Sequence, residues 1–342
     1  MFDITDLSVP IVAAPMAGGP STPALATAVG DAGGLGFLAA GYAAPATVAE
    51  QIRQVRSATT APFGVNVFVP GAPADPAAVA AYRAELEPEA ARYDADLPEP
   101  DPGDDDHWDD KLALLVDDPV PVVSFTFGVP DRDVVQRLRA AGSAVLVTVT
   151  SPGEAAAAVS AGADVLCVQG PEAGGHRGTF DPEADPDPTP LPALLAAVTA
   201  MSPIPVVAAG GIMTGDDVAA AMRAGTVAVQ LGTAFLRTPE SGARRAHKDA
   251  LADARFDTTT LTRAFSGRWA RGLRNGFVDA HPDAPAGYPM VDQMTKPLRA
   301  AAAALGDPER MSLWAGTGYR AATEEPAATV TTRLWERARN SR

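Results

Sequence analysis

The chain has 342 residues, enough to bury the core of one large α/β barrel or of two ordinary domains. Its 42 acidic and 27 basic residues give a formal charge of −15, which argues against nucleic acid or an anionic membrane as partner and favours a small molecule. No stretch reaches the roughly 18 apolar residues of a membrane span, and the first residues do not resemble a secretory signal. Since Cys167 is the single cysteine, we expect a cytoplasmic monomer or homodimer without intrachain disulfides.

Short apolar runs alternate with alanine-rich amphipathic segments, and each pair predicts a strand followed by a helix. The pairs are Ile11–Met16 with Pro23–Ala32, Gly36–Ala40 with Ala46–Arg56, Phe63–Val69 with Pro76–Leu86, Pro121–Phe127 with Asp131–Ala141, Ala144–Thr150 with Pro152–Ala161, Asp164–Val168 with Leu191–Ala200, Val206–Ala209 with Gly215–Ala224, and Ala228–Leu231 with Pro239–Ala252. Eight such units in about 250 residues predict an α/β fold of the TIM (β/α)8 barrel type. A doubly wound open sheet is the alternative, but Ala17–Ser21 lacks the G-x-G-x-x-G fingerprint expected after its first strand.

Two regions interrupt this alternation. The segment Glu85–Asp118 is rich in proline and aspartate, and we interpret it as an insertion with an exposed acidic loop before the fourth strand. The polar stretch from Arg237 to Pro297 is expected to form a small, mostly helical cap domain beside the barrel mouth, inserted after strand eight. The predicted barrel therefore comprises residues 1–236 and 298–342, and the predicted cap comprises residues 237–297.

A glycine-dense loop with one histidine follows the sixth predicted strand. The apolar run Asp164–Val168 breaks into Gln169–Gly178, which contains His176. Glycines let the backbone approach a ligand closely, and barrel active sites lie at the carboxyl ends of the strands. The unperturbed pKa of imidazole suits proton transfer near neutrality, so His176 is the predicted catalytic acid/base.

The seventh and eighth predicted strands also end at glycines. Gly211 follows the seventh strand, and Gly232 and Thr233 follow the eighth. Loops at these two positions of a TIM barrel often bind phosphate through backbone amides and a helix N-terminus. Tight turns explain such glycines equally well one loop at a time, but their occurrence after both strands favours a phosphate site.

Two amide side chains are expected to face the same cavity. Asn66 lies in the third predicted strand and Gln169 follows the sixth. Their donors and acceptors suit the polar edge of a flavin ring, although Asn66 equally suits a buried structural role. A flavin ring joined to the phosphate site predicts FMN as cofactor, with Met16 contacting the ring or filling the core. No spacing of metal-ligating residues indicates a metal site. The remaining histidines, predicted to lie at the surface, are His107, His247 and His281.

Several of these residues fall within motifs of a known family. The motifs are Pro15–Gly18, Ser21–Pro23, Ala32–Gly36, Gly64–Val67, Gln169–His176, Ala209–Ile212, Gln230–Thr233, Thr262–Arg268, Arg271–Asn275 and Ser312–Gly316. With them the chain resembles, over nearly its whole length, the class I nitronate monooxygenases, formerly 2-nitropropane dioxygenases, which are FMN-dependent TIM-barrel enzymes. The piece Glu172–His176 is the most specific of these motifs.

The resemblance implies roles for particular positions. His176 would be the catalytic acid/base, and Tyr288 and Lys296 look like the family's substrate-side tyrosine and lysine. A cation there suits an anionic nitronate, although Lys296 equally suits an exposed position at a helix start. The FMN-binding residues predicted from the residues and the resemblance together are Met16, Asn66, Gln169, Gly174, Gly175, Gly211, Gln230, Leu231, Gly232 and Thr233.

The chain departs from the family pattern at the fourth strand. Relatives usually carry Phe-His-Phe-Gly there, whereas this chain has Phe125–Gly128 with Thr126 in place of the histidine. Thr126, a predicted substrate-side residue, forms hydrogen bonds but does not titrate near pH 7.

The activity that the resemblance implies is oxidation of alkyl nitronates, with propionate 3-nitronate as the expected substrate. FMN and O2 would convert the nitronate to a carbonyl compound and nitrite. The alternatives are an FMN-dependent enoyl-ACP reductase with a nicotinamide donor and a non-catalytic flavin-binding barrel. The acidic chain shows no basic patch for an acyl carrier protein, and a purely binding site has no need of a general base.

Overall fold

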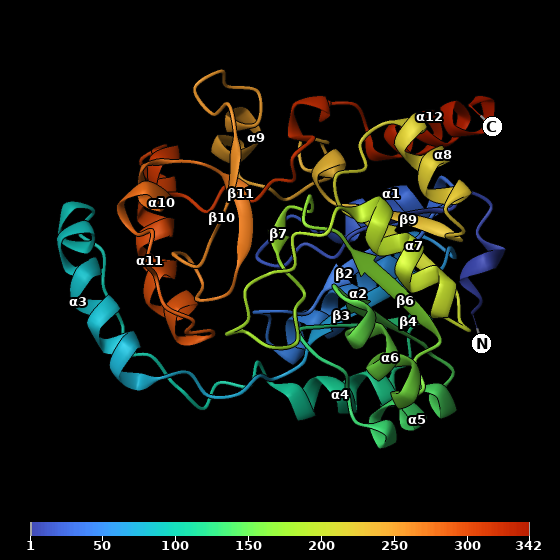
Figure 1. The fold of residues 1–342 in the computed structure, drawn as a ribbon, viewed down its shortest axis with the longest axis horizontal. Coiled ribbons are helices and arrows are strands. Elements are labelled where there is room, and N and C mark those ends of the chain that lie inside the picture. The colour runs from blue at the N-terminus through green and yellow to red at the C-terminus, as the bar shows by residue number, and fades with distance from the viewer. Residues whose placement is uncertain (1, 342) are drawn as a thin grey trace.

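A computed structural model describes residues 2–341, and eight parallel strands form a barrel at its centre (Figure 1). The spatial order is β1-β9-β8-β6-β5-β4-β3-β2, and a parallel bridge between Val12 and Leu35 joins the two ends of the sheet. The strands are β1 (Ile11–Ala13), β2 (Gly36–Ala39), β3 (Phe63–Phe68), β4 (Val122–Thr126), β5 (Ala144–Val149), β6 (Val165–Gln169), β8 (Val206–Ala209) and β9 (Ala228–Leu231). The predicted TIM barrel is confirmed.

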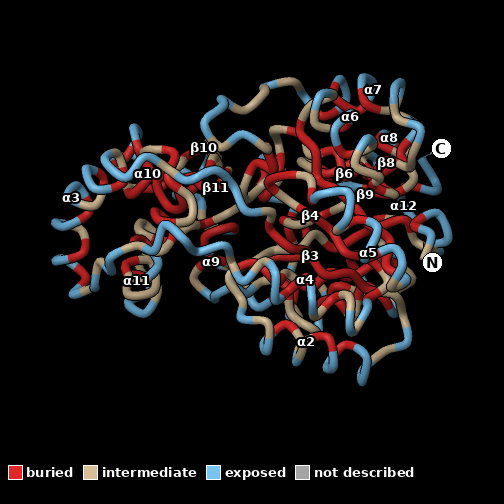
Figure 2. The backbone as a smooth tube through the Cα atoms, turned by 90° about the horizontal axis from the view of Figure 1, so that it is seen from below, coloured by how far each residue is buried: buried red, intermediate tan, exposed pale blue. Residues whose placement is uncertain are grey.

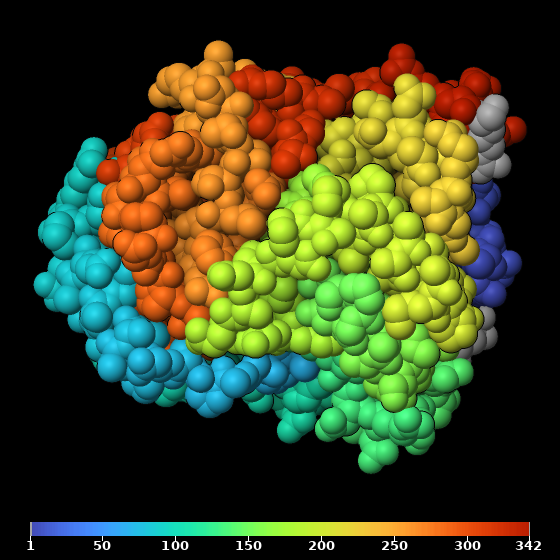
Figure 3. Space-filling view, viewed as in Figure 1, coloured from blue at the N-terminus to red at the C-terminus, as the bar shows by residue number. Residues whose placement is uncertain are grey.

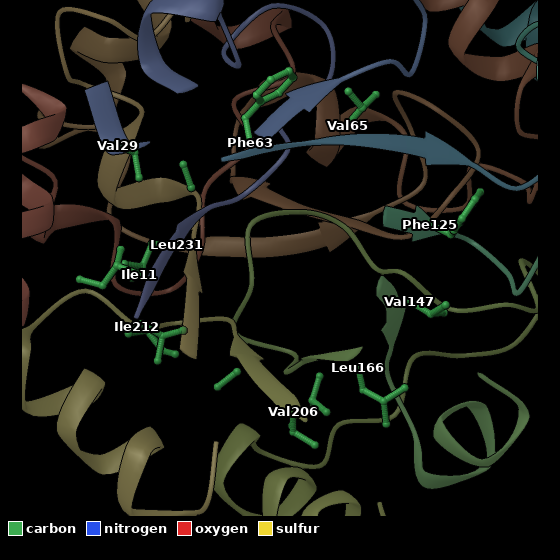
Figure 4. Packing of buried hydrophobic residues seen from close by; sticks show 14 of the residues in the cluster. Ile11, Val29, Phe63, Val65, Phe125, Val147, Leu166, Val206, Ile212 and Leu231 are labelled. Atoms are coloured by element: carbon green, nitrogen blue, oxygen red, sulfur yellow. The ribbon is translucent and has the colours of Figure 1, made fainter. Parts of the chain in front are cut away.

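The strands read as continuous apolar runs because both of their faces are buried. Every residue of β3 and β5 is buried, and the barrel strands are coloured as buried in Figure 2. Successive residues alternate between two apolar clusters. Cys167 and Val207 belong to the smaller cluster, and their neighbours Leu166 and Val206 belong to the larger one. In Figure 4, Leu166 and Val206 point away from the ring of strands.

Eight helices surround the barrel, and two of them differ from the predicted ones. They are α1 (Pro23–Asp31), α2 (Pro45–Ala58), α4 (Trp108–Asp117), α5 (Arg132–Ala141), α6 (Pro152–Ala161), α7 (Leu191–Met201), α8 (Gly215–Arg223) and α12 (Ala327–Asn340). The helix packed beside β3 is α4, not the predicted Pro76–Leu86, and α12 packs against α1 and α8 in the place predicted for Pro239–Ala252. Periodicity indicates that a helix buries one face but not which partner covers it.

A second unit lies beside the barrel mouth and has an apolar core of its own. Its elements are α3 (Pro76–Arg92), α9 (Arg245–Ala250), β10 (Thr259–Thr262), β11 (Ala270–Leu273), α10 (Gly276–Ala280) and α11 (Met290–Ala304). Phe265, Phe277 and Met294 pack with Tyr82 and Leu86 of α3 in this core. Figure 3 shows these segments on one flank, in orange and cyan, touching the yellow-green loop that follows β6.

The second unit is not the predicted cap alone. Helix α3 begins before the predicted insertion Glu85–Asp118 and ends within it, yet it packs in the second unit. The hairpin β10–β11 adds strands to this unit, and the boundary expected at residue 297 falls inside α11. The division into residues 237–297 and the rest therefore stays a prediction. The remaining described elements are the two-residue strand β7 (Gly175–His176) and four short 3-10 helices: Ile4–Asp6, Thr233–Phe235, Pro308–Arg310 and Tyr319–Ala321. Within residues 2–341, no helix is long and apolar enough to cross a membrane.

Candidate active site

A cavity of about 760 Å³ opens at the carboxyl ends of the barrel strands and is walled on one side by α11. It brings together residues that lie far apart in the sequence. The predicted site residues that line it are Met16, Asn66, Thr126, Gln169, Gly174, Gly175, His176, Gly211, Gln230, Leu231, Gly232, Thr233 and Lys296. Tyr288 does not line this cavity but lies behind the wall, with its ring centroid 6.3 Å from that of His176.

His176 lies in a short strand that pairs with a strand of the second unit. It belongs to β7 (Gly175–His176), which pairs with β11 so that His176 lies opposite Ala270. Its Nε2 lies 2.8 Å from Ser266 Oγ. The rings of Phe127 and Trp314 both have centroids 5.6 Å from the imidazole. The second unit thus fixes the orientation of the predicted catalytic side chain.

The surroundings of His176 favour a neutral imidazole. Burial, and to a smaller extent the nearby Arg268 and Arg299 guanidinium groups, together lower its pKa to about 3. Arg268 is itself buried and stacks on Phe127, with its guanidinium carbon 4.1 Å from the ring centroid. At neutral pH the imidazole of His176 is therefore neutral, and its pKa must rise, as it would beside an anionic ligand, before the imidazole can hold a proton.

Asn66 is oriented by two hydroxyl donors. Its Oδ1 accepts hydrogen bonds from Ser124 Oγ at 2.8 Å and from Thr126 Oγ1 at 3.0 Å. The amide oxygen is thereby satisfied within the wall, and the Asn66 NH2 group is left to face the cavity. Thr126 therefore does more than replace a histidine, because it helps to set the direction of this amide donor.

Gln169 is engaged with the loop that carries His176. Its Nε2 donates to the His176 carbonyl oxygen at 2.9 Å, and its Oε1 accepts from the Gly178 amide at 2.8 Å. Arg177, also buried, donates to the Gln169 carbonyl oxygen at 2.8 Å. This side chain fixes the loop, while a direct contact with a cofactor stays a prediction.

The loops after β8 and β9 present backbone amides without acceptors. Gly210 and Gly211 have φ of +112° and +69°, which makes the tight turn that one of the two interpretations expects. The amides of Gly211, Ile212 and Thr233 make no backbone hydrogen bond within the described chain although all three residues line the cavity. Unpaired amides in a cavity wall indicate a ligand acceptor such as phosphate. Thr233 also accepts, at Oγ1, from the Gly316 amide at 2.9 Å.

Glycines keep the floor of the cavity open. A Cβ at Gly175 would meet no atom within 4 Å, and one at Gly232 would lie 3.6 Å from Met16 Sδ. These openings, together with the Asn66 NH2 group and the unpaired amides, fit a flat ring joined to a phosphate. The residues present therefore suit FMN.

Lys296 lines the cavity from within a helix. It lies in the second turn of α11 and is exposed, so it does not stand at a helix start. On the same helix, Asp292 and Arg299 form a partly buried ion pair with Oδ1 and Nη2 2.7 Å apart. The Lys296 ammonium is therefore the cation of α11 that remains available to an anionic ligand among these three residues.

Two histidines predicted at the surface are buried. His247 lines the cavity with its Nε2 3.0 Å from the Trp314 carbonyl oxygen, and His281 packs between Tyr82 and Phe277. The charged sequence around His247 conceals the apolar face of the short helix α9. His107 is exposed as predicted. In the described chain no group of histidine, cysteine or acidic side chains is arranged to hold a metal ion.

Several site residues were not singled out from the sequence. Ser266, Phe127, Trp314 and Tyr42 contact or surround the His176 ring or line the same cavity. Ser266 and Trp314 fall within motifs that carry the resemblance, which was the available signal for them. Phe127 has a left-handed φ of +78°, a conformation that no sequence pattern here announces.

Comparisons with known proteins agree with this arrangement. The family model described as nitronate monooxygenase matches residues 2–335. The chain belongs to the nitronate monooxygenase family. It is 44% identical to a nitronate monooxygenase of Pseudomonas aeruginosa, with 96% of each chain covered, and 36% identical to a probable nitronate monooxygenase of Staphylococcus aureus strain Newman, with 96% of this chain and 94% of the relative covered.

Solved structures of relatives share the whole fold. A nitroalkane oxidase from Streptomyces ansochromogenes is 53% identical, with a TM-score of 0.96 over 99% of this chain and 98% of its own. FabK from Thermotoga maritima is 28% identical, with a TM-score of 0.77 over 99% and 95% of the two chains. The resemblance drawn from the motifs is confirmed, and with it the assignment of this protein to the flavin-dependent oxidoreductases.

Proposed function

We propose that the protein oxidises alkyl nitronates, propionate 3-nitronate in particular, with bound FMN and O2, and releases a carbonyl compound and nitrite. One observation carries the proposal. A neutral imidazole, His176, faces the same cavity as two loops of unpaired amides, after β8 and β9, that suit a phosphate. The nitronate monooxygenase relatives support the substrate class.

The side chains divide the work between cofactor and substrate. The loops at Gly211 and Thr233 would hold the FMN phosphate, and the Asn66 NH2 group would donate to the ring. FMN would supply the electron transfer between nitronate and O2, which no side chain of the cavity can carry. The cofactor would also need a fixed orientation in the cavity, and the two loops and the Asn66 amide would provide it.

His176 would act as the acid/base. Burial and two neighbouring arginines keep its imidazole neutral, and the negative charge of a bound nitronate would raise its pKa so that it could hold a proton during turnover. Ser266 binds Nε2 and leaves the other ring nitrogen for the cavity. Lys296 would offset the negative charge of the nitronate, and Thr126 and Tyr288 stay predicted substrate-side residues.

The second candidate is an FMN-dependent enoyl reductase with a nicotinamide donor. It ranks second because the relatives at 44% and 36% identity are named nitronate monooxygenase or probable nitronate monooxygenase. A third candidate, a flavin-binding barrel without catalysis, leaves the buried neutral His176 without a purpose.

One preparation distinguishes these candidates. The purified protein is loaded with FMN, and nitrite and O2 consumption are measured with propionate 3-nitronate in the presence and absence of NADH. We expect nitrite without NADH. A parallel assay measures NADH oxidation with an enoyl thioester as acceptor. NADH oxidation there, with no nitrite from the nitronate, would instead establish the reductase. A flavin that neither the nitronate nor NADH reduces would establish the binding barrel.

A further inference from the structure

A buried arginine lies against the cavity wall beside His176. Arg268 follows Ser266, whose hydroxyl contacts the His176 ring, by two residues. Arg268 is 2% exposed and does not line the cavity. Its guanidinium carbon lies 4.1 Å from the ring centroid of Phe127, a residue that does line the cavity, and 5.7 Å from that of Tyr288. The positive charge is therefore in contact with the wall and not with the cavity itself.

No carboxylate of the described chain pairs with Arg268. Its Nη1 donates to the Thr179 carbonyl oxygen at 2.9 Å, and its buried Nε has no hydrogen-bond partner. The carboxylates whose charges act on the guanidinium are those of Asp181 and Glu154, and neither forms an ion pair with it. A buried charge is costly unless an opposite charge lies near it. An anionic ligand in the cavity would supply the charge that the protein does not.

The other ionisable groups around this wall do not offset the charge. Burial raises the pKa of the Tyr288 and Tyr42 phenols well above their ordinary value, so both stay neutral. Among the described residues that line the cavity, Asp292 is the only acidic one, and it is paired with Arg299. Lys296 adds a second cation without an ion-pair partner. The cavity and its wall therefore carry an excess of positive charge in a chain whose formal charge is −15.

The charge of Arg268 acts at the position of His176. After burial, it is the largest cause that lowers the pKa of His176. The Phe127 centroid lies 5.6 Å from that of His176 and 4.1 Å from the Arg268 guanidinium carbon. The two groups are thus within about 10 Å of each other, where Coulomb's law at an effective dielectric of about 20 gives an anion a preference of about tenfold over a neutral ligand. The field that repels a proton from His176 attracts an anion beside it.

We propose that Arg268 is a specificity-determining residue, which makes the cavity beside His176 select anionic ligands without touching them. That the anion is a nitronate rests on the proposed function. A nitronate and its parent nitroalkane differ by one proton and have nearly the same size, so packing contacts separate them poorly. Specificity is a difference between two affinities, and the Arg268 charge contributes to the affinity of the nitronate alone.

The first test uses acetate and acetamide, which have the same shape and differ by one charge. Their dissociation constants from the FMN-loaded protein are measured at pH 7 by the change in flavin absorbance. We expect the parent to bind acetate at least about tenfold more tightly than acetamide. Arg268→Gln removes the charge but keeps a donor for the Thr179 carbonyl oxygen, and it should weaken acetate about tenfold while acetamide changes less than about twofold. A parent without preference for acetate, or an equal loss for both ligands, would overturn the proposal.

Three further variants separate charge from packing. Arg268→Met is a second neutral variant and should match Arg268→Gln, whereas Arg268→Lys keeps the charge and should bind acetate within about threefold of the parent. Arg263→Gln is the matched control, because Arg263 also stacks on a ring, 4.5 Å from the Trp269 centroid, but the Glu183 and Asp185 carboxylates act on its charge. It should leave both ligands unchanged. A lysine variant as weak as the two neutral ones would overturn the role of the charge.

The second test uses the proposed substrate class. Ethyl nitronate and nitroethane are compared as an anion and its neutral conjugate acid, the first by its KM and the second by its inhibition of nitronate oxidation. Arg268→Gln should raise KM for ethyl nitronate about tenfold and leave inhibition by nitroethane within about twofold. An unchanged KM would overturn the proposal. If the FMN-loaded parent oxidised no nitronate, the proposed function would fail, whereas the preference for acetate would still decide the role of Arg268.

Discussion

Two neighbouring glycines beside His176 allow a sharp test of the packing. A Cβ built on Gly174 would lie 2.4 Å from Gly316 N and 2.5 Å from the Ala315 carbonyl carbon, which are backbone atoms without rotamer freedom. A Cβ on Gly175 would meet no atom within 4 Å, but its φ of +76° disfavours any L side chain. The same methyl group therefore costs free energy by two different mechanisms at adjacent positions.

The structure sets the expected magnitudes. To reach ordinary contact distances, Gly174→Ala must push residues 315–316 away by about 1 Å, and such overpacking costs about 3 kcal/mol at the upper end of the usual range. Gly175→Ala should cost about 1 kcal/mol through its left-handed backbone. The larger shift also pulls the Gly316 amide from Thr233 Oγ1, so Gly174→Ala should weaken FMN binding as well.

The assay is urea unfolding of the apoproteins, followed by FMN titration of the folded variants. We expect a lower unfolding midpoint for Gly174→Ala than for Gly175→Ala, and both below the parent, with an unchanged slope. The apoprotein is used because a methyl group at Gly175 would point into space that the cofactor is proposed to fill. A Gly174→Ala protein as stable as Gly175→Ala would refute the contact between residue 174 and residues 315–316.

Three further predictions concern the pH dependence of stability, Thr126 of the fourth strand, and the ion pair between the buried Lys111 ammonium and Asp106. The pKa is lowered mainly by burial, to about 3 for His176 and to about 4 for His247. Below about pH 6.5 these two histidines therefore bind protons in the unfolded chain but not in the native chain. The free energy of unfolding should fall as pH drops from 6.5 to 4. In urea unfolding at several pH values, His247→Gln should reduce that slope; an unchanged slope would contradict the assignment. Thr126→Val removes one of the two hydroxyl donors to Asn66 Oδ1 and should weaken FMN binding about fivefold by fluorescence titration, whereas no change would mean that Ser124 alone orients the amide. Lys111→Met leaves Asp106 without its cation and should destabilise the protein by about 3 kcal/mol in thermal unfolding, and a neutral effect would show that the pair is dispensable.

The barrel could be predicted because its physical signals are local. A strand buried on both faces is a short apolar run, and a helix with one buried face is periodic, so the alternation of the two types determined the fold class. What could not be predicted is which helix covers which strand. Helix α3 buries Tyr82 and Leu86, yet the residues that cover them, Phe265, Phe277 and Met294, lie more than 170 residues later in the chain.

The same distinction applies to the site. His176, Asn66 and the glycine loops were predictable because a barrel brings the carboxyl ends of its strands together. The contact of Ser266 with His176 was not, although Ser266 lies in a motif of the resemblance, because the two residues stand 90 positions apart and meet only when β7 pairs with β11. Tyr42 was not singled out either. His247 was misjudged because charged neighbours indicate an exposed helix even when one residue of it faces a cavity.

The most direct test of the central claim compares the FMN-loaded parent with His176→Asn. Asparagine keeps a hydrogen-bonding side chain near Ser266 but cannot accept a proton in the neutral range. With equal flavin content by absorbance, we predict nitrite release from propionate 3-nitronate by the parent and a loss of at least about a hundredfold in kcat/KM by the variant. A variant that binds flavin and releases nitrite at the parental rate would contradict the role of His176.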